Sequence, residues 1–507
     1  MEQLSGQDAS FLYFETPHSP MHIGSFMVYD PSTAPGGFVR FKDILAHMET
    51  RLHLSRAFRQ KLVHVPMNMD HPYWVLDNEF DLEFHVRHIA LPRPGDWRQL
   101  CIQVARLHSR PLDLSKPLWE MYVIEGLDDV EGCPPGSFAV LTKIHHAIID
   151  GASGSEITAF IHDIEADPAN KPEVQPYHPE PEPNPFELMA RANFNNATQP
   201  FRFLEVMTRS MPGMMRVTQG FGMNEFRPAS QAPRTRFNGQ VSSHRVVDGR
   251  SFPLEEIKAI KNAVPGATVN DAVLSLVGGA LRRYLGSKEE LPDGTLTAMA
   301  PISVRSEGEK GSAGNQVSAM MVELGSHIED PVERLAFVYS STSNSKALTN
   351  AIGARNLADY SKFIPSQLAG LASRLMTSPA FRAAAENSTP AYNCVVTNVP
   401  GPQVPLYFAG AQAVKFVGFG PITDGMGLIH PVYSYCGQLA VCFTSCREMI
   451  PDPEYYSACL QAAFDEAKQA AALLAGSGGS SEAESAQLRK PKKPGKPRSA
   501  RTQTNKT

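Results

Sequence analysis

Hydrophobic and polar positions change their period at the middle of a short apolar stretch in the first third of the chain. From position 138 to position 144 the side chains alternate between two sets, which would point to opposite faces of a strand. One set is Phe138, Val140, Thr142 and Ile144, and the other is Ala139, Leu141 and Lys143. This period of two predicts a strand that ends at the histidines. Apolar residues then recur at helical spacing, at Ile157, Phe160, Ile161 and Ile164. We therefore predict a strand, a short turn and a helix, with His145 and His146 at the turn.

A second helix is predicted in the other half of the chain. Its apolar stripe consists of Ala272, Val273, Leu276, Val277, Ala280, Leu281 and Leu285. Thr268 and Asp271 have the spacing of a capping pair at its start. Asn270 and Asp271 are thus first-turn residues that favour the helix dipole, and a supporting role at an active site is compatible with that position.

Proline divides the chain. Seven prolines lie between residues 168 and 185 among acidic residues, a composition that stays extended and does not pack a core. We predict a first domain over 1–165, a proline-rich linker and methionine-rich helical segment over 166–235, a second domain over 236–475 and a disordered basic tail over 476–507. The methionine-rich part, 186–216, is interpreted either as a helix that bridges to the second domain or as a surface that contacts lipid.

Composition is that of a large globular protein, with 507 residues, 42% of them hydrophobic and 20% charged. The seven cysteines lack disulfide or zinc spacing, and neighbouring histidines on a strand point to opposite faces, so we expect no metal. No secretory leader is visible, and the long uncharged stretches 387–414 and 425–446 are broken by Pro, Gly and polar residues. We expect a cytoplasmic chain whose membrane contact, at the inner face or at lipid inclusions, is peripheral.

The tail carries eight positive charges and no acid after Glu484, whereas the whole chain has a formal charge of −5. Without residues 485–507, which hold these eight charges, the formal charge is −13, which describes an acidic body with a basic tether. Such a tail attracts anionic lipid head groups by about 1 kcal/mol per charge close to the surface. A solvated tail and a weak, non-specific RNA contact are the alternatives, and we expect no specific nucleic acid.

Imidazole at the turn suggests hydroxyl activation. A neutral histidine accepts the proton of an alcohol, the oxygen attacks an acyl carbonyl, and the imidazolium returns the proton to the leaving group. Asp150 follows His146 by four residues and can fix the loop or the ring tautomer, while Gly151 permits a backbone shape that a Cβ forbids. The chain has no Gly-x-Ser-x-Gly nucleophile elbow, no His-Glu-x-x-His and no P-loop.

The string His145-His146-Ala147-Ile148-Ile149-Asp150-Gly151 resembles the active-site motif of the CoA-dependent acyltransferase superfamily. Other segments resemble, in family order, those of the bacterial wax ester synthase/diacylglycerol acyltransferases: Leu4–Phe11, Pro20–Gly24, Arg110–Asp113, Pro117–Glu120, Asn270-Asp271, Pro301–Arg305 and Ser434–Gly437. The resemblance runs from residue 4 to about residue 460, and it is what names the substrate class.

The resemblance implies an α/β fold of two chloramphenicol-acetyltransferase-like domains, each a mixed sheet with packed helices, around a shared active-site channel. It implies an acyl-CoA-dependent O-acyltransferase that makes triacylglycerol from diacylglycerol or wax esters from long-chain alcohols. His146 would be the catalytic base, with His145, Asp150, Gly151, Asn270 and Asp271 in orienting or supporting roles. No cofactor is expected besides acyl-CoA as substrate. A condensation-type enzyme and a non-catalytic lipid-droplet protein are the alternatives.

Overall fold

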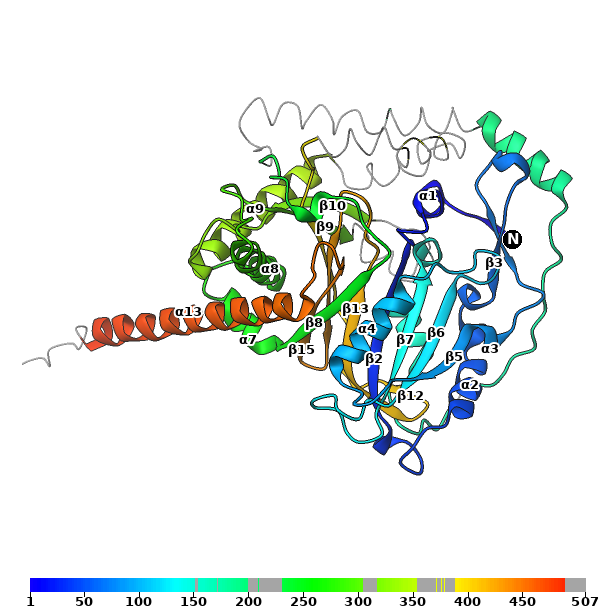
Figure 1. The fold of residues 1–507 in the computed structure, drawn as a ribbon, viewed down its shortest axis with the longest axis horizontal. Helices are drawn as coiled ribbons and strands as arrows, with labels where there is room; N and C mark the ends of the chain where they lie inside the picture. The colour runs from blue at the N-terminus through cyan, green and yellow to red at the C-terminus, as the bar shows by residue number, and fades with distance from the viewer. Residues whose placement is uncertain are drawn as a thin grey trace, which may run out of the picture.

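The computed structural model describes residues 1–150, 154–170, 172–198, 208, 230–303, 317–352, 371, 375, 378 and 388–487. Two mixed six-stranded sheets organise this part of the chain, and they lie in the two halves of the molecule seen side by side in Figure 1. The predicted α/β class with two mixed sheets is confirmed.

The first sheet carries the histidine turn. Its strands lie in the order β12 (Tyr407–Phe408), β13 (Ala411–Phe419), β2 (His22–Asp30), β7 (Phe138–His145), β6 (Trp119–Glu125) and β5 (Val86–Ala90). Only β5 and β6 pair in parallel within it. Side chains of β2 alternate between the two faces: Met27 and Tyr29 pack in one apolar cluster, Phe26 and Val28 in another.

Two strands of this sheet come from the far end of the sequence. β13 pairs antiparallel with β2 from Gln412 against Asp30 to Phe419 against Gly24, and β12 follows at the sheet's edge. Both strands fall inside the 236–475 segment that we predicted as the second domain. The sheet of the first half is thus completed by residues 407–419 of the second. The domain boundaries at 165 and 235 remain predictions.

The second sheet has the order β10 (Val317–Glu323), β9 (Thr297–Ser303), β11 (Cys394–Val399), β14 (Leu428–Tyr435), β15 (Gln438–Cys446) and β8 (Arg245–Pro253). β14 and β15 are joined by Cys436 and Gly437, which both have positive φ, as a two-residue hairpin turn requires. This turn accounts for the glycine of the Ser434–Gly437 segment. A small third sheet, β1 (Glu2–Gln3), β4 (Tyr73–Leu76) and β3 (Gln60–Val63), lies at the N-terminal end.

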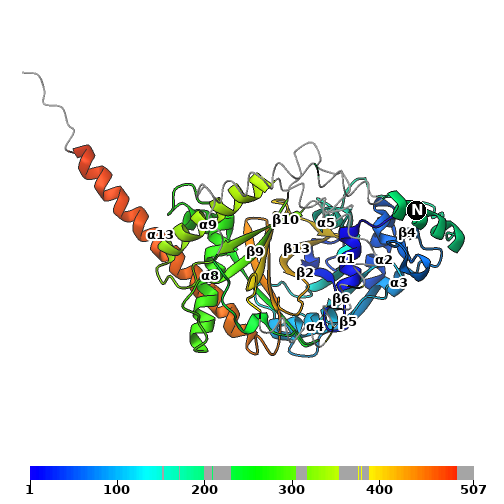
Figure 2. The ribbon, with the colours of Figure 1, turned by 90° about the horizontal axis from the view of Figure 1, so that it is seen from above.

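Helices cover both sheets. Those of the first half are α1 (Gly6–Phe14), α2 (Phe41–Glu49), α3 (Leu82–His85), α4 (Trp97–His108) and α5 (Gly154–Ile161), and those of the second are α7 (Leu254–Lys261), α8 (Val269–Ser287), α9 (Pro331–Ile352) and α13 (Pro453–Gln487). Figure 2 shows α8, α9 and α13 together on the outside of the second sheet. α8 lies at the centre of the largest apolar core. α13 continues past residue 475, where we predicted the tail to begin, and residues 488–507 lie outside the described part.

The proline-rich segment has no helix or strand over its described residues 172–184 and is held against the first half. Tyr177 donates a hydrogen bond to the Asp77 carbonyl, and the Arg59 guanidinium lies 4.4 Å from the Tyr177 ring centre. A helix then spans 185–198, and its Leu188 and Ala192 are buried against the third sheet. The rest of the predicted methionine-rich segment lies outside the described residues, Thr208 excepted.

Candidate active site

The histidine turn is placed as the sequence predicted. β7 ends at His145, a 3₁₀ turn (η5, His146–Asp150) follows, and α5 begins at Gly154. The backbone is fixed from two sides: His145 N–H donates to the Leu118 carbonyl and His146 N–H to the Met21 carbonyl, each at 2.9 Å. The neighbouring segments of the sheet therefore hold the turn, and they fix the backbone positions from which the two imidazoles project.

His145 is fully buried and its ring is oriented by two hydrogen bonds. Nε2 lies 3.0 Å from a Glu15 carboxylate oxygen, and Nδ1 lies 3.1 Å from the Ala147 backbone nitrogen. The Ala147 N–H is a donor, so Nδ1 must be unprotonated and Nε2 must carry the hydrogen that Glu15 accepts. His145 is thereby fixed as one neutral tautomer, which suits a supporting residue and leaves it no free nitrogen for catalysis.

His146 has a different environment. Its ring stacks on Phe11 of α1, with ring centres 3.9 Å apart and planes inclined by 15°, and the side chain is partly exposed. Burial of the ring lowers the pKa of His146 to about 4, so the imidazole is neutral near pH 7. Its Nδ1 is buried and has no hydrogen-bond partner among the described residues. A neutral imidazole has one unprotonated nitrogen, and this nitrogen can accept a proton.

The other two predicted members of the turn are Asp150 and Gly151. Asp150 closes η5, but its side chain is not described, and Gly151 lies outside the described residues. Their proposed roles in fixing the loop remain predictions. No group of three His, Cys, Asp or Glu side chains in the described ranges has the arrangement of a metal site.

Asp271 is the second member of the capping pair that the sequence predicted, with Thr268 as the N-cap of α8. Its carboxylate accepts hydrogen bonds from the Thr268 N–H and hydroxyl, each at 2.7 Å, and Thr268 caps α8 in return. The other carboxylate oxygen accepts from the Thr342 hydroxyl of α9 at 2.6 Å. Asp271 is completely buried, so it joins the start of α8 to α9.

Asn270 lies beside the cap and faces a residue of the second sheet. The Asn398 amide nitrogen lies 3.5 Å from the Asn270 amide oxygen, which brings the start of α8 to the end of β11. Among the described contacts, none joins Asn270 or Asp271 to the histidine pair. The two amides form a polar pair between α8 and the second sheet.

Trp119 and two residues near the N-terminus complete the surroundings. Trp119 is buried, donates its indole N–H to the Phe58 carbonyl at 2.9 Å and stacks on His85, so its role is packing. By contrast, the sequence did not predict that Glu15 and Phe11 contact the histidine pair. Phe11 ends one of the segments that carried the resemblance, but only the fold shows that α1 lies over the turn.

The comparisons with known proteins identify the family of this chain. Residues 4–273 match the wax ester synthase/diacylglycerol acyltransferase catalytic domain, and residues 313–468 match the C-terminal domain of the same family. A protein of Mycobacterium tuberculosis strain CDC 1551, provisionally named a diacylglycerol O-acyltransferase, is 34% identical over 454 residues, which cover 89% of this chain and 87% of that protein. A second relative with such a provisional name, from Mycobacterium bovis, is 33% identical and covers 93% of this chain and 100% of the relative.

Solved structures show the same architecture. The wax ester synthase/diacylglycerol acyltransferase from Marinobacter aquaeolei VT8 superposes with a TM-score of 0.66 at 25% identity, covering 93% of this chain and all of that one. The first condensation domain of the calcium-dependent antibiotic synthetase gives a TM-score of 0.54 at 12% identity, covering 93% and 97%. The second likeness shows the fold alone.

Proposed function

Because the chain belongs to the wax ester synthase/diacylglycerol acyltransferase family, we propose that it is an acyl-CoA-dependent O-acyltransferase that makes triacylglycerol from diacylglycerol. Long-chain alcohols are the second acceptor, since the solved relative is named for both activities. The observation that carries the proposal is the neutral and partly exposed His146 side chain, at a turn fixed by the sheet and by Glu15 through His145.

In the proposed reaction His146 accepts the proton of the acceptor hydroxyl. The oxygen attacks the thioester carbonyl directly, and coenzyme A leaves as a thiol after His146 returns the proton. No covalent acyl-enzyme is needed. The oxyanion requires a donor, which Asn270 or a backbone N–H supplies, and loss of such a donor costs about 3–4 kcal/mol.

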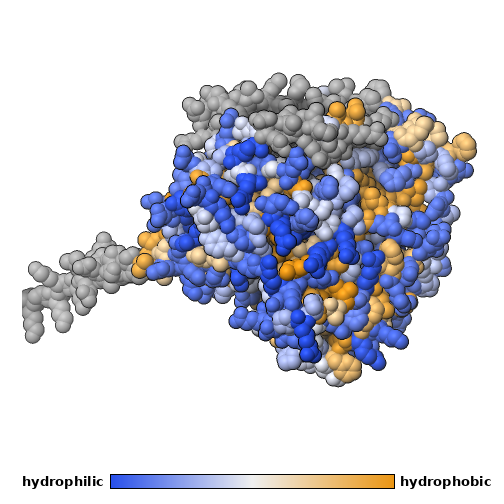
Figure 3. Space-filling view, viewed as in Figure 1, coloured by the Kyte–Doolittle hydropathy of each residue, from blue (hydrophilic) through white to orange (hydrophobic). Residues whose placement is uncertain are grey.

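Peripheral contact with lipid belongs to the same proposal, because both acceptors are apolar. None of the helices in the described ranges is long and apolar enough to cross a membrane. The helix at 185–198, however, exposes Phe186 at 81% and Phe194 at 66% on the side opposite its buried Leu188. Apolar side chains gather at this end of the molecule in the upper right of Figure 3. We assign lipid contact to this surface, at the inner membrane face or at lipid inclusions.

In the test, purified protein is incubated with labelled palmitoyl-CoA and either dipalmitoylglycerol or hexadecanol. Both the ester and the released thiol are measured. Triacylglycerol should form, and His146→Ala should reduce the rate by about 10²–10⁴-fold, the usual contribution of a general base. The exposed His178 provides a matched control, since His178→Ala should retain wild-type activity. Equal activity of the wild type and His146→Ala would exclude the mechanism, and absence of ester with either acceptor would favour a non-catalytic lipid-binding role.

A further inference from the structure

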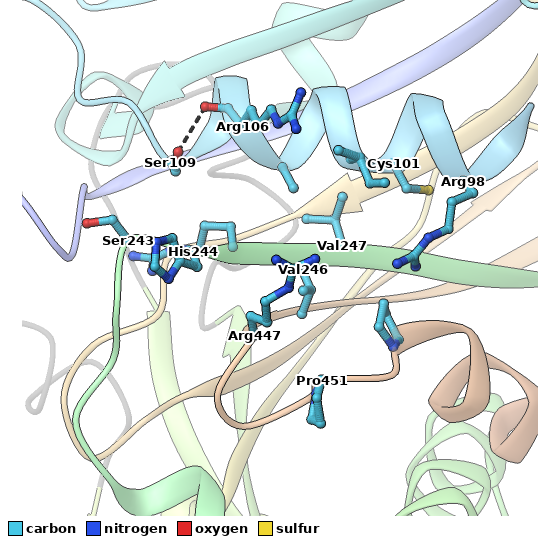
Figure 4. Close-up of a pocket in the computed structure, with 14 residues that line it drawn as sticks. Arg98, Cys101, Arg106, Ser109, Ser243, His244, Val246, Val247, Arg447 and Pro451 are labelled. Carbon is cyan, nitrogen blue, oxygen red and sulfur yellow. Dashed lines mark hydrogen bonds between the residues drawn. The ribbon is translucent and has the colours of Figure 1, made fainter. Parts of the chain in front are cut away.

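A basic cavity lies apart from the histidine turn, between α4 of the first half and β8 of the second. It has a volume of about 200 Å³ and is closed on its third side by the segment 447–453 (Figure 4). Its apolar wall is formed by side chains of α4 and β8: Cys101, Ile102, Ala105, Val246 and Val247. The cavity thus combines an apolar wall with the charged groups described next.

Arginine dominates the polar part of the wall. Arg98, Arg106, Arg245 and Arg447 line the cavity together with His244, and no Asp or Glu is among its described lining residues. This is unexpected in a chain with a net charge of −5. In Figure 4 the side chains of Arg98 and Arg447 extend from opposite walls into the space between α4 and the 447–453 segment. Two acids lie just outside the lining, Glu454 against Arg98 and Glu448 against His244, so the charge that is left to attract an anion is mainly that of Arg106 and Arg447.

The arginines differ in how far they are already occupied. Arg245 is buried and donates to the carbonyls of Ser242 and His18, and burial lowers its pKa to about 10, so it stays protonated at neutral pH. Arg98 forms an ion pair with Glu454. The side chains of Arg106 and Arg447 are exposed and have no acidic partner in the parts of the chain that are described. Two guanidinium groups are therefore free to bind a ligand.

Guanidinium groups match phosphate oxygens with paired N–H donors. The adjoining apolar wall would accept a flat or aliphatic part of the same molecule. Coenzyme A is a molecule of this kind, with a nucleotide ring next to three phosphates and a thiol arm that places the reacting sulfur far from them. We propose that this cavity binds the phosphate-bearing nucleotide end of acyl-CoA. The inference rests on the proposed function, which requires that substrate.

The cavity is also connected to the histidine turn through packed residues. On one side Ser243 lies 2.9 Å from His18 Nδ1, and His18 is in the loop that begins with Glu15, the partner of His145. On the other side α4 ends at His108, whose ring packs edge-on against His22 at 4.7 Å. His22 in turn pairs with His145 across β2 and β7. The cavity therefore lies on the side of the turn that faces β2 and the end of α4.

The first test is a binding measurement that needs no turnover. Calorimetric titration with desulfo-coenzyme A and with adenosine 3′,5′-bisphosphate is compared for the wild type, Arg447→Ala and Arg106→Ala/Arg447→Ala. The double variant should bind both ligands at least about tenfold more weakly, which corresponds to about 1.4 kcal/mol, because it loses the charge-assisted hydrogen bonds of two guanidinium groups. Arg93→Ala, which removes an exposed arginine outside the cavity, is the matched control.

Kinetics then separate recognition from folding. The double variant should raise KM for palmitoyl-CoA and leave KM for palmitoyl-pantetheine, which lacks the phosphates, unchanged. The lysine pair Arg106→Lys/Arg447→Lys keeps the charge and should restore part of the affinity even if the alanine variant is unstable. Unchanged binding of desulfo-coenzyme A in a folded double variant, or no binding to the wild type, overturns the proposal.

A third arm distinguishes the other source of phosphate. Phosphatidylglycerol vesicles should bind the double variant and the wild type equally; a loss of vesicle binding with unchanged nucleotide binding assigns the cavity to a lipid head group and overturns our proposal. If the wild type binds coenzyme A through these arginines yet forms no ester, the proposed acyl transfer fails and the nucleotide site stands.

Discussion

Lowering the pH from 7 to 5 should destabilise this protein because several of its histidines are buried in neutral form. Burial lowers the pKa of His108 and of His430 to about 3 and that of His162 to about 4, from an ordinary value of 6.5. Both ring nitrogens of His162 are hydrogen-bonded: the Tyr29 hydroxyl lies 2.7 Å from Nε2, and the Thr158 carbonyl lies 2.6 Å from Nδ1. Between pH 6.5 and pH 5 such rings become protonated in the unfolded chain, whereas in the folded chain they stay neutral.

The sign and size follow from proton linkage. Below pH 6.5 the unfolded chain binds protons that these folded histidines do not, so the free energy of unfolding falls as the pH falls. At pH 5 each histidine with a pKa near 3 or 4 contributes a loss of about 2 kcal/mol, and three contribute about 6 kcal/mol. That is a large share of the 5–15 kcal/mol by which proteins are typically stable. Glu448, with its pKa lowered to about 2, loses its contribution only below about pH 4.5 and does not affect this window.

The measurement is urea unfolding at pH 7, 6 and 5, with a variant that removes one titrating ring. His162→Gln keeps an acceptor for Tyr29 and a donor for Thr158, so the variant should fold and should lose about 2 kcal/mol less than the wild type between pH 7 and 5. His178→Gln, at an exposed position, should follow the wild type. An identical pH dependence for the wild type and His162→Gln would refute the assignment of this ring as neutral and buried.

Three further predictions concern the site and the tail. Glu15→Ala should lower both kcat and the melting temperature, because the hydrogen bond from His145 to a charged acceptor is worth about 1.5–3 kcal/mol. Glu15→Gln keeps an acceptor for His145 and should recover most of the activity. Equal losses in the two variants would contradict a positioning role. Asp271→Ala should reduce the free energy of unfolding by about 1–3 kcal/mol through the lost cap and the Thr342 hydroxyl, measured by denaturant unfolding, and an unchanged midpoint would exclude this structural role. Truncation after Gln487 should leave the acyl transfer rate unchanged and weaken co-sedimentation with anionic vesicles most at low salt; no loss at either salt would exclude a membrane tether.

Local patterns predicted the local elements well. The alternation that ends at His145 and the helical spacing after it correspond to β7 and α5, and the Thr268 and Asp271 pair is the cap of α8. These features depend on residues within a few positions of one another, whose periodicity and capping chemistry are readable from one sequence.

Long-range partners were not readable. Glu15 and His145 are 130 positions apart, and nothing in the sequence around Glu15 distinguishes it from a surface acid. The basic cavity has the same origin, since Arg106 and Arg447 meet only because α4 of one half lies against β8 of the other. The placement of such pairs depends on strand order and helix packing, which local patterns do not determine.

The position of β13 has a consequence for the order in which the chain can fold. β2 pairs with β7 on one side and needs β13 on the other, so during synthesis its second edge stays open until residues 411–419 have left the ribosome. At about 5–20 residues per second, that interval after β7 lasts on the order of tens of seconds. An open strand edge invites pairing with other chains. A nascent chain of this protein is therefore expected to depend on chaperones until its last third has been translated, and an isolated N-terminal half should aggregate.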